Sequence, residues 1–372
     1  MPEAVIVSIA RSPIGRAMKG SLKGMRPDDL AAQMVQAALD KVPALDPTDI
    51  NDLILGCGLP GGEQGFNMGR NVAVQLGYDF IPGTTITRYC SSSLQTTRMA
   101  LHAIKAGEGD VFISAGVESV SSFATGTADG WPNTKNALYA DAQARTELAA
   151  QGGVAWKDPR EDGLTPDIYI SMGQTAENVA SLTGISREDQ DRWGVRSQNR
   201  AEEAINRGFF ANEITPVTLA DGTVVSTDDG PRAGTSYDKI SQLKPVFRPD
   251  GTVTAGNACP LNDGAAALVI MSDTKAKALG YAKMTTSDID LYEINEAFAV
   301  QVLSSARELG MDHDKLNVSG GAIALGHPFG MTGARITATL LNNLTTQDKT
   351  FGLETMCVGG GQGMAMIIER LS

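Results

Sequence analysis

The sequence predicts an α/β protein made of two halves with a further domain inserted between them. Strand-like and helix-like runs alternate in the first third of the chain, a more charged region follows, and strand-like runs return toward the end. Alternating strands and helices form sheets that helices cover. A chain of 372 residues is long enough for two or three such packed units.

The first half contains three short apolar runs that we interpret as buried strands, AVIVSIA (4–10), DLILGCG (52–58) and VFISAGV (111–117). Apolar residues with helical spacing appear in DDLAAQMVQAALDKV (28–42) and again in the stretch after Cys90. These elements predict the order of strands and helices in the first half of the protein.

The middle of the chain differs in composition, because it is richer in Asp, Arg and Gly and its expected helices, such as 186–208, have wide polar faces. Further strands are expected at 265–272, 288–295 and 363–369, with a helix at 334–344. We assign the chain to a first half at 1–120 completed by about 262–282, an inserted domain at 121–261, and a second half at 283–372.

The composition excludes several classes of protein. The chain has 42% hydrophobic and 20% charged residues and a formal net charge of -12, which argues against a basic surface for nucleic acid but allows a local basic pocket. Its first residues, MPEAVIVSIARSP, have no basic segment before the apolar run and are not typical of a signal peptide. No apolar run is long enough to predict a membrane span.

The four cysteines, Cys57, Cys90, Cys259 and Cys357, are far apart and form no CxxC pair. This spacing argues against a zinc site and against a disulfide framework. We therefore expect no metal, reduced thiols and a cytoplasmic protein. Any one of these cysteines, taken alone, is explained well enough as a small buried hydrophobic residue.

Cys90 stands in TRYCSSSLQTTRMALHAI, directly before an expected helix. Unpaired N–H groups and the helix dipole at such a position lower the pKa of a thiol below its usual value of about 8.5. The serines that follow would let a substrate approach the backbone closely, although serines at a helix start are also ordinary caps. The pattern indicates a candidate nucleophile.

His327 is one of three histidines and lies in NVSGGAIALGHPFGMTGAR, between a glycine and a proline. His102 falls inside an expected helix and His313 in the polar stretch MDHDKL, so both are interpreted as structural or solvated. A lone histidine is more often structural than catalytic, but rigid Gly/Pro surroundings suit a base that must be held in place.

Two further stretches contain residues that could take part in catalysis. In LETMCVGGGQGMAMII, Cys357 ends an expected strand, and the N–H groups of the glycines after it could hold an oxyanion or simply form a tight turn. In YEINEAFAVQVL, Asn295 stands at a strand-to-helix junction, where helix capping explains it as well as chemistry does.

Together the cysteine stretch, NEAFA, GGAIALGHP and CVGGG resemble the thiolase superfamily in content and in order. Shorter stretches agree with the same family: RSPIGR, AGVES, MGQTAENVA, LKPVF and GTVTAGNACPLNDGAAAL. The resemblance covers nearly the whole chain. It implies the thiolase fold, in which two similar α/β halves form a layered α-β-α-β-α core with an inserted loop domain.

The resemblance also implies a set of catalytic roles. Cys90 would take the acyl group from an acyl-CoA as a thioester, and His327 would activate it. Asn295 would hold a water that, with His327, donates to the thioester oxygen. Cys357 would be the second acid/base, acting at the α-carbon of the acetyl unit or at the CoA thiol, and the N–H groups of Cys90 and Gly359 would form the other oxyanion hole.

By the same resemblance the inserted domain binds coenzyme A as substrate and product, and no permanently bound cofactor is expected. The expected CoA contacts are Arg232 and Phe247 at the adenosine end, and Leu164, Met172, Ala255, Cys259 and Phe298 along the pantetheine arm. The family often has serine at the position of Cys259 and histidine at the position of Ser171. These departures weaken the assignment of the pantetheine-arm contacts more than they weaken the assignment of the catalytic residues.

A larger departure lies between Gly280 and Met284. Thiolases usually carry a further strand and helix there, including a loop that lines the acyl pocket, whereas this chain has only three residues, 281–283. We interpret the gap as a deletion, natural or engineered, or as an incomplete sequence. The mass of the intact protein, 39.1 kDa for the sequence as given, distinguishes these.

CSSSLQT is more similar to degradative 3-ketoacyl-CoA thiolases than to biosynthetic acetyl-CoA acetyltransferases, and we expect thiolytic cleavage in fatty acid β-oxidation. Three alternatives stay open: a biosynthetic acetyl-CoA acetyltransferase that condenses two acetyl-CoA molecules, a catalytically silent acyl-CoA or lipid-binding member of the fold, and a subunit of a β-oxidation complex. The family also implies a dimer or tetramer, with no nucleic acid or membrane partner.

Overall fold

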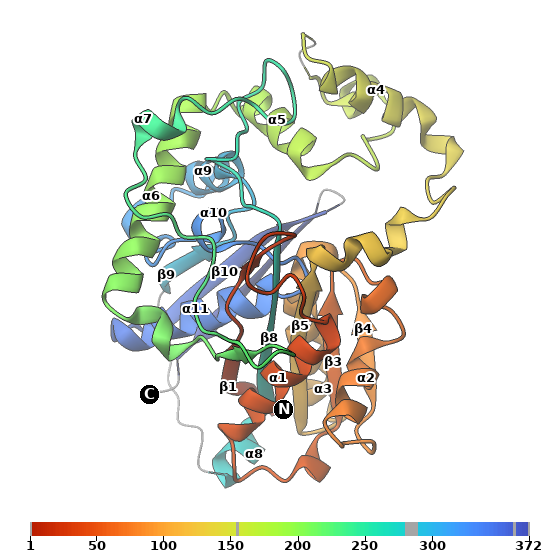
Figure 1. Cartoon of the computed structure of the whole chain (residues 1–372), viewed down its shortest axis with the longest axis vertical. Coiled ribbons are helices and arrows are strands. Elements are labelled where there is room, and N and C mark those ends of the chain that lie inside the picture. The colour runs from red at the N-terminus through yellow and green to blue at the C-terminus, as the bar shows by residue number, and fades with distance from the viewer. Residues whose placement is uncertain (1, 154–155, 280–288, 360–361, 371–372) are drawn as a thin grey trace.

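The computed structural model describes residues 2–153, 156–279, 289–359 and 362–370. The expected gap at 281–283 lies outside the described residues. Within them, the strands and helices form two α/β halves around a layered α-β-α-β-α core, with an inserted segment that arches over one end (Figure 1). The predicted fold class is confirmed.

The first half is built on a mixed sheet with the strand order β1-β8-β5-β3-β4. β8 is antiparallel to both β1 and β5, while β3 is parallel to β5 and β4. The strands of this sheet are β1 (Ala4–Arg11), β2 (Gly15–Arg16), β3 (Asp52–Cys57), β4 (Gly83–Ile86), β5 (Val111–Ser119) and β8 (Asn262–Ser272). β8 thus follows the insertion in the chain and joins the first sheet between β1 and β5.

Helices cover both faces of this sheet. α1 (Pro27–Asp40) has a proline and two acidic residues in its first turn, both favourable at a helix N-terminus, and it packs on β1, β5 and β8. α2 (Met68–Gln75) packs on β3 and β4, and α3 (Ser92–Ala106) packs on β3 and β5 from the inner side. α8 (Asp273–Ala278) follows β8.

The second half repeats part of this order around a three-stranded sheet, β11-β10-β9. β9 (Ile289–Ile294) is parallel to β10 (Phe351–Val358), and β10 is antiparallel to β11 (Gln362–Glu369). α11 (Thr332–Thr346) precedes β10 as α3 precedes β5, and the two helices pack against each other between the sheets. α9 (Ala299–Glu308) and the short α10 (Ala322–Leu325) complete this half.

The inserted segment contains α4 (Ala140–Ala150), α5 (Met172–Thr183), α6 (Arg187–Asn206), the short α7 (Tyr237–Ile240) and the strands β6 (Val217–Thr218) and β7 (Val224–Val225). α5 and α6 pack on α9, whereas α4 stands away from the core at the upper right of Figure 1. Ser171 caps α5 by accepting from the backbone N–H of Gln174 at 3.4 Å. None of the helices in the described ranges is both long and apolar enough to cross a membrane.

Candidate active site

Cys90 lies in a 3₁₀ turn, Tyr89–Ser91, immediately before α3. Tyr89 has a positive φ of 44°, a conformation that costs energy for a bulky residue. The Ser92 hydroxyl holds this turn, because it accepts from the N–H of Arg88 at 2.9 Å and donates to the carbonyl of Tyr89 at 2.6 Å. The turn therefore presents Cys90 at the junction of α3, α11 and β10.

The structure overturns one expectation for Cys90, the lowered pKa of its thiol. Burial raises the pKa well above its usual value, and the nearby Cys357, Cys259 and Glu118 add to this effect. The N–H of Gly359 acts in the opposite direction but does not compensate. Desolvation disfavours the thiolate more than the helix end favours it, because Leu94, Ile336 and Met356 enclose the thiol.

His327 is fully enclosed in the turn before α11, and both its backbone and its ring are fixed. Its backbone N–H donates to Asn262 Oδ1 at 3.0 Å, and its Nδ1 lies 2.6 Å from Thr332 Oγ1. The Thr332 hydroxyl donates to the carbonyl of Pro328 at 2.7 Å, so its oxygen is left to accept from Nδ1–H. This arrangement places the acceptor lone pair of the imidazole on Nε2.

Burial lowers the pKa of His327 to about 3, and the buried Arg335 contributes further. The ring is therefore neutral at pH 7 and able to accept a proton. Phe329 connects it to the thiol: its ring centroid lies 5.3 Å from that of His327, and it packs against the cluster that contains Cys90.

Asn295 follows β9 and faces the imidazole, with Nδ2 at 3.3 Å from His327 Nε2. It does not cap α9, whose N-cap is Phe298, so the capping interpretation is wrong. Asn295 Oδ1 is buried and has no partner among the described residues. A buried acceptor of this kind is usually satisfied by an ordered water.

Cys357 lies near the end of β10 and belongs to an apolar cluster at the base of the inserted segment. Burial raises the pKa of its thiol to about 11, and that of Cys259 to about 12. Met172 and Phe247 pack in the same cluster, and the Phe247 and Phe298 rings meet edge-on with centroids 6.1 Å apart. Cys357, Cys259, Met172, Phe247 and Phe298 are thus brought together.

The other expected CoA contacts lie on the surface. Leu164 is half-exposed, and Ala255 and Arg232 are exposed. The Arg232 backbone N–H donates to Gln198 Oε1 at 2.8 Å. Gly359 lies against Tyr89, whose ring a Cβ at that position would approach to 3.1 Å.

Glu118 is a positioning residue that the sequence alone did not single out, although it lies in AGVES. Its buried carboxylate accepts from the N–H groups of Gly58 at 2.6 Å and Gly330 at 2.7 Å, and from Gln64 Nε2 at 3.1 Å. It thereby ties the loop after β3 to the loop that carries His327. Across the ranges described here, no cluster of His, Cys, Asp and Glu could hold a metal ion.

Two family matches and several relatives place this arrangement in a known class of enzymes. Residues 4–274 match the thiolase N-terminal domain and residues 264–370 the thiolase C-terminal domain. A 3-ketoacyl-CoA thiolase of Bacillus subtilis is 39% identical over 415 aligned positions, which cover 99% of this chain and 100% of that protein. A β-ketoadipyl-CoA thiolase of Acinetobacter baylyi is also 39% identical, over 100% of both chains.

The crystal structure of an acetyl-CoA acetyltransferase of Bacillus anthracis superposes with a TM-score of 0.83 at 35% identity, covering 99% of each chain. The fold and the family matches thus define the class as CoA-dependent acyltransferases. The chain belongs to the thiolase family.

Proposed function

We propose that the protein is a 3-ketoacyl-CoA thiolase that cleaves its substrate through an acyl-Cys90 intermediate. Cys90 Sγ attacks the 3-keto carbon, and the bond between C2 and C3 breaks. The acetyl-CoA carbanion takes a proton from Cys357. CoA then gives its thiol proton to Cys357 and attacks the acyl-enzyme, which releases the shortened acyl-CoA and returns Cys90.

The observation that carries this proposal is that Cys357 acts electrostatically on the buried Cys90 thiol, while Phe329 contacts both the Cys90 cluster and the enclosed His327 ring. Because burial favours the thiol form of Cys90 and the neutral form of His327, the nucleophile is made during attack by proton transfer to Nε2. The resulting imidazolium can donate to the substrate oxygen, beside a water held by Asn295. The N–H groups of Cys90 and Gly359 serve the second oxyanion.

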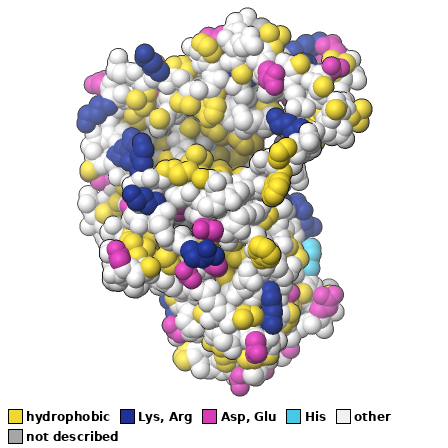
Figure 2. All heavy atoms as spheres, turned by 45° about the vertical axis from the view of Figure 1, so that its right-hand side comes forward, with side chains coloured by type: hydrophobic (Ala, Val, Ile, Leu, Met, Phe, Trp, Pro, Cys, Tyr) yellow, Lys and Arg dark blue, Asp and Glu magenta, His cyan; other side chains and the backbone are white. Residues whose placement is uncertain are grey.

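The inserted segment supports a path for CoA. Hydrophobic side chains line a hollow between the lobe formed by this segment and the core (Figure 2). We assign the pantetheine arm to this hollow, along Met172, Phe298 and Cys259, with Leu164 and Ala255 farther out. The exposed Arg232 would meet the phosphates and Phe247 the adenine end.

Peptide mapping after brief iodoacetamide treatment tests the nucleophile. Cys90 is expected to alkylate first, because it alone has a neighbouring base and an approach path for an acyl group. Acetyl-CoA added beforehand is expected to protect it. Labelling led by Cys57 or Cys259 would contradict the assignment.

One alternative has a specific observation in its favour, since the solved relative described above is an acetyl-CoA acetyltransferase. The same site would then condense two acetyl-CoA molecules, with Cys357 taking the proton from the α-carbon. Thiolysis rates for 3-ketoacyl-CoA substrates from four carbons upward separate the two. Activity confined to acetoacetyl-CoA would favour the acetyltransferase.

The assembly and the cellular setting belong to the same proposal. We assign the enzyme to the cytoplasm, to fatty acid β-oxidation and to a homotetramer, with a dimer as the smaller unit. Light scattering at micromolar concentration tests the assembly, and a monomer would contradict it. Size-exclusion chromatography with candidate β-oxidation enzymes tests for a larger complex.

A further inference from the structure

A cavity of about 650 Å³ lies between α6, α9 and the turn that follows α9. Its lining shares Ile185 and Leu303 with the apolar cluster that contains Phe298, but its Arg196 on α6 lies on another side of that helix than the expected CoA contact Arg232. Gln198, which holds the backbone of Arg232, lies two residues after Arg196 on α6 and therefore about 200° around the helix axis. The cavity residues are Ile185, Asp189, Arg192, Trp193, Arg196, Leu303, Ala306, Arg307, Gly310, Met311 and His313.

The cavity is cationic, although the chain as a whole is acidic. Arg196 stacks on Trp193, 5.1 Å from the ring centroid, and donates to the carbonyl of His313. Arg307 donates to the carbonyl of Thr183 at 3.0 Å. In the described part of the chain, neither guanidinium has a carboxylate within ion-pair distance.

The acidic groups near the cavity are engaged elsewhere or lie farther away. Asp189 is bonded to the Ser186 hydroxyl at 2.7 Å, and Glu188 holds Arg192 at 2.7 Å. Asp312 and Asp314 act on Arg196 only at longer range. Burial and the neighbouring Arg200 lower the pKa of Arg196, whereas Asp314, Glu296 and Asp312 act to raise it.

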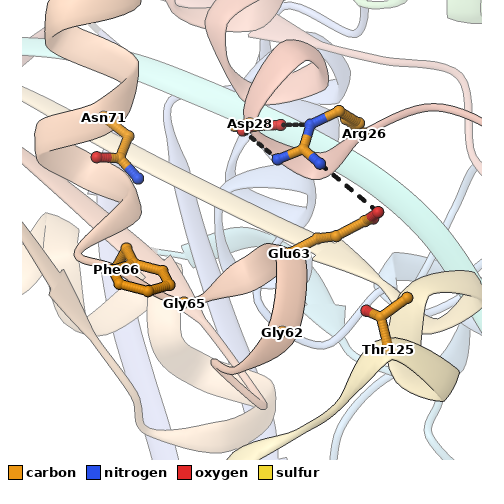
Figure 3. Close-up of a pocket in the computed structure, with 8 residues that line it drawn as sticks. All are labelled: Arg26, Asp28, Gly62, Glu63, Gly65, Phe66, Asn71 and Thr125. Carbon is orange, nitrogen blue, oxygen red and sulfur yellow. Dashed lines mark hydrogen bonds and ion pairs between the residues drawn. The ribbon is translucent and has the colours of Figure 1, made fainter.

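A second cavity, of about 340 Å³, provides a contrast (Figure 3). Its only arginine, Arg26, is already paired with Asp28 at 2.8 Å and with Glu63 at 3.6 Å. A ligand anion there would compete with two carboxylates. The larger cavity has no such competition at Arg196 and Arg307.

The cavity lining also has an apolar part, which includes Ile185, Leu303 and Met311. A cavity of this size is typical of small-molecule sites, and guanidinium groups bind phosphate or carboxylate in a bidentate manner. We propose that this cavity binds an organic anion, with its phosphate or carboxylate on Arg196 and Arg307 and its apolar body against Leu303 and Met311, and that the occupant acts on the catalytic half through Trp193.

The second part of the proposal follows a chain of contacts. Trp193 Nε1–H donates to Glu296 Oε1 at 3.2 Å, and Ser197 Oγ donates to Glu296 Oε2 at 2.5 Å. Glu296 is adjacent in sequence to Asn295, which faces His327. A ligand that shifts Arg196 against Trp193 therefore acts on the segment that positions Asn295. This part rests on the proposed function, whereas the binding itself does not.

Calorimetry with phenyl phosphate and with octanoate tests the binding, in the presence of saturating CoA so that the CoA path is filled. We expect saturable binding of at least one probe, and the stronger one identifies the head group. Arg196→Gln and Arg307→Gln are each expected to weaken it by roughly 10-fold or more, and Arg196→Lys by less. Arg160→Gln, on an exposed loop, is the control with the same charge change.

Absence of saturable binding by both probes, or equal binding by all variants, would overturn the site. The rate of Cys90 acylation by acetyl-CoA is then measured with and without the bound probe. A probe-dependent change that disappears in Arg196→Gln supports the coupling, and an unchanged rate overturns it. If acetyl-CoA fails to acylate Cys90 even without a probe, the proposed function fails and the binding result still stands.

Discussion

The second α/β half repeats part of the order of elements of the first, and the two halves differ in how their last strands are enclosed. β8 lies between β1 and β5 and is buried along its whole length. β11 pairs only with β10 among the described strands, and most of its residues are exposed or half-buried, with Ile367 62% exposed. α1 covers β8 from outside, and no described helix has that position on β11.

This difference indicates that the packing of the second half is concentrated on the face of its sheet that points toward the first half. α11 packs on β9 and β10 from between the sheets, and the turn that holds Cys90 packs on both α11 and β10. We propose that the second half lacks a strand and a helix that thiolases usually carry between the counterparts of Gly280 and Met284, a stretch outside the described residues. The intact mass of the purified protein tests whether those residues are absent.

The largest expected effect comes from removing His327, the base that the second half is proposed to supply to Cys90 of the first half. His327→Ala should abolish acylation of Cys90, because the thiol loses its base and the thioester oxygen loses a donor. One oxyanion donor is worth roughly 10²–10³ in rate, and a general base roughly 10²–10⁴. Mass spectrometry after incubation with acetyl-CoA measures the acylation.

Cys357→Ala is the matched variant in the same half. Acyl transfer to Cys90 should survive, while thiolysis of acetoacetyl-CoA should slow by roughly 10²–10⁴, because only proton transfer at the α-carbon and the CoA thiol is lost. Normal turnover by this variant, or acylation of His327→Ala at the parent rate, would show that the roles are wrongly assigned.

Many of the elements in this comparison could be predicted from the sequence. Properties that depend on residues far apart in the chain could not, for a physical reason. The strand runs and the helix after Cys90 are local patterns, and so are the glycine turns around His327. The pKa of Cys90 is not local, because Ile336 and Met356, which bury it, are more than 240 residues away in the chain. The role of Glu118 likewise depends on Gly330, which joins it only after folding.

A smaller effect should distinguish the contributions of β8 and β11 to the free energy of unfolding. Leu268→Ala, in the fully buried β8, should cost about 2–5 kcal/mol of unfolding free energy, because it leaves a cavity. Ile367→Ala, on the exposed face of β11, should change it by about 0.5 kcal/mol or less. Urea unfolding followed by circular dichroism measures both, and equal costs would mean that β11 is covered in solution.

The last expected effect depends on pH and concerns Glu354, a buried carboxyl group in β10. Its Oε1 accepts from Thr337 Oγ1 at 2.9 Å, and its Oε2 has no partner among the described residues. Glu293 faces it from β9 and Arg335 from α11. Burial raises the pKa of Glu354 to about 8.

The folded protein therefore holds this proton where the unfolded chain has released it. The resulting stability is fully present below pH 4.5 and is lost as the pH rises through about 8, by at most about 1.4 kcal/mol per pH unit. Glu354→Gln removes this slope, so the variant should gain on the parent between pH 5 and pH 8. Glu118→Gln should instead lose stability at both pH values, since its amide would face the N–H groups of Gly58 and Gly330. Identical pH profiles for Glu354→Gln and the parent would mean that Glu354 is already ionised in the fold.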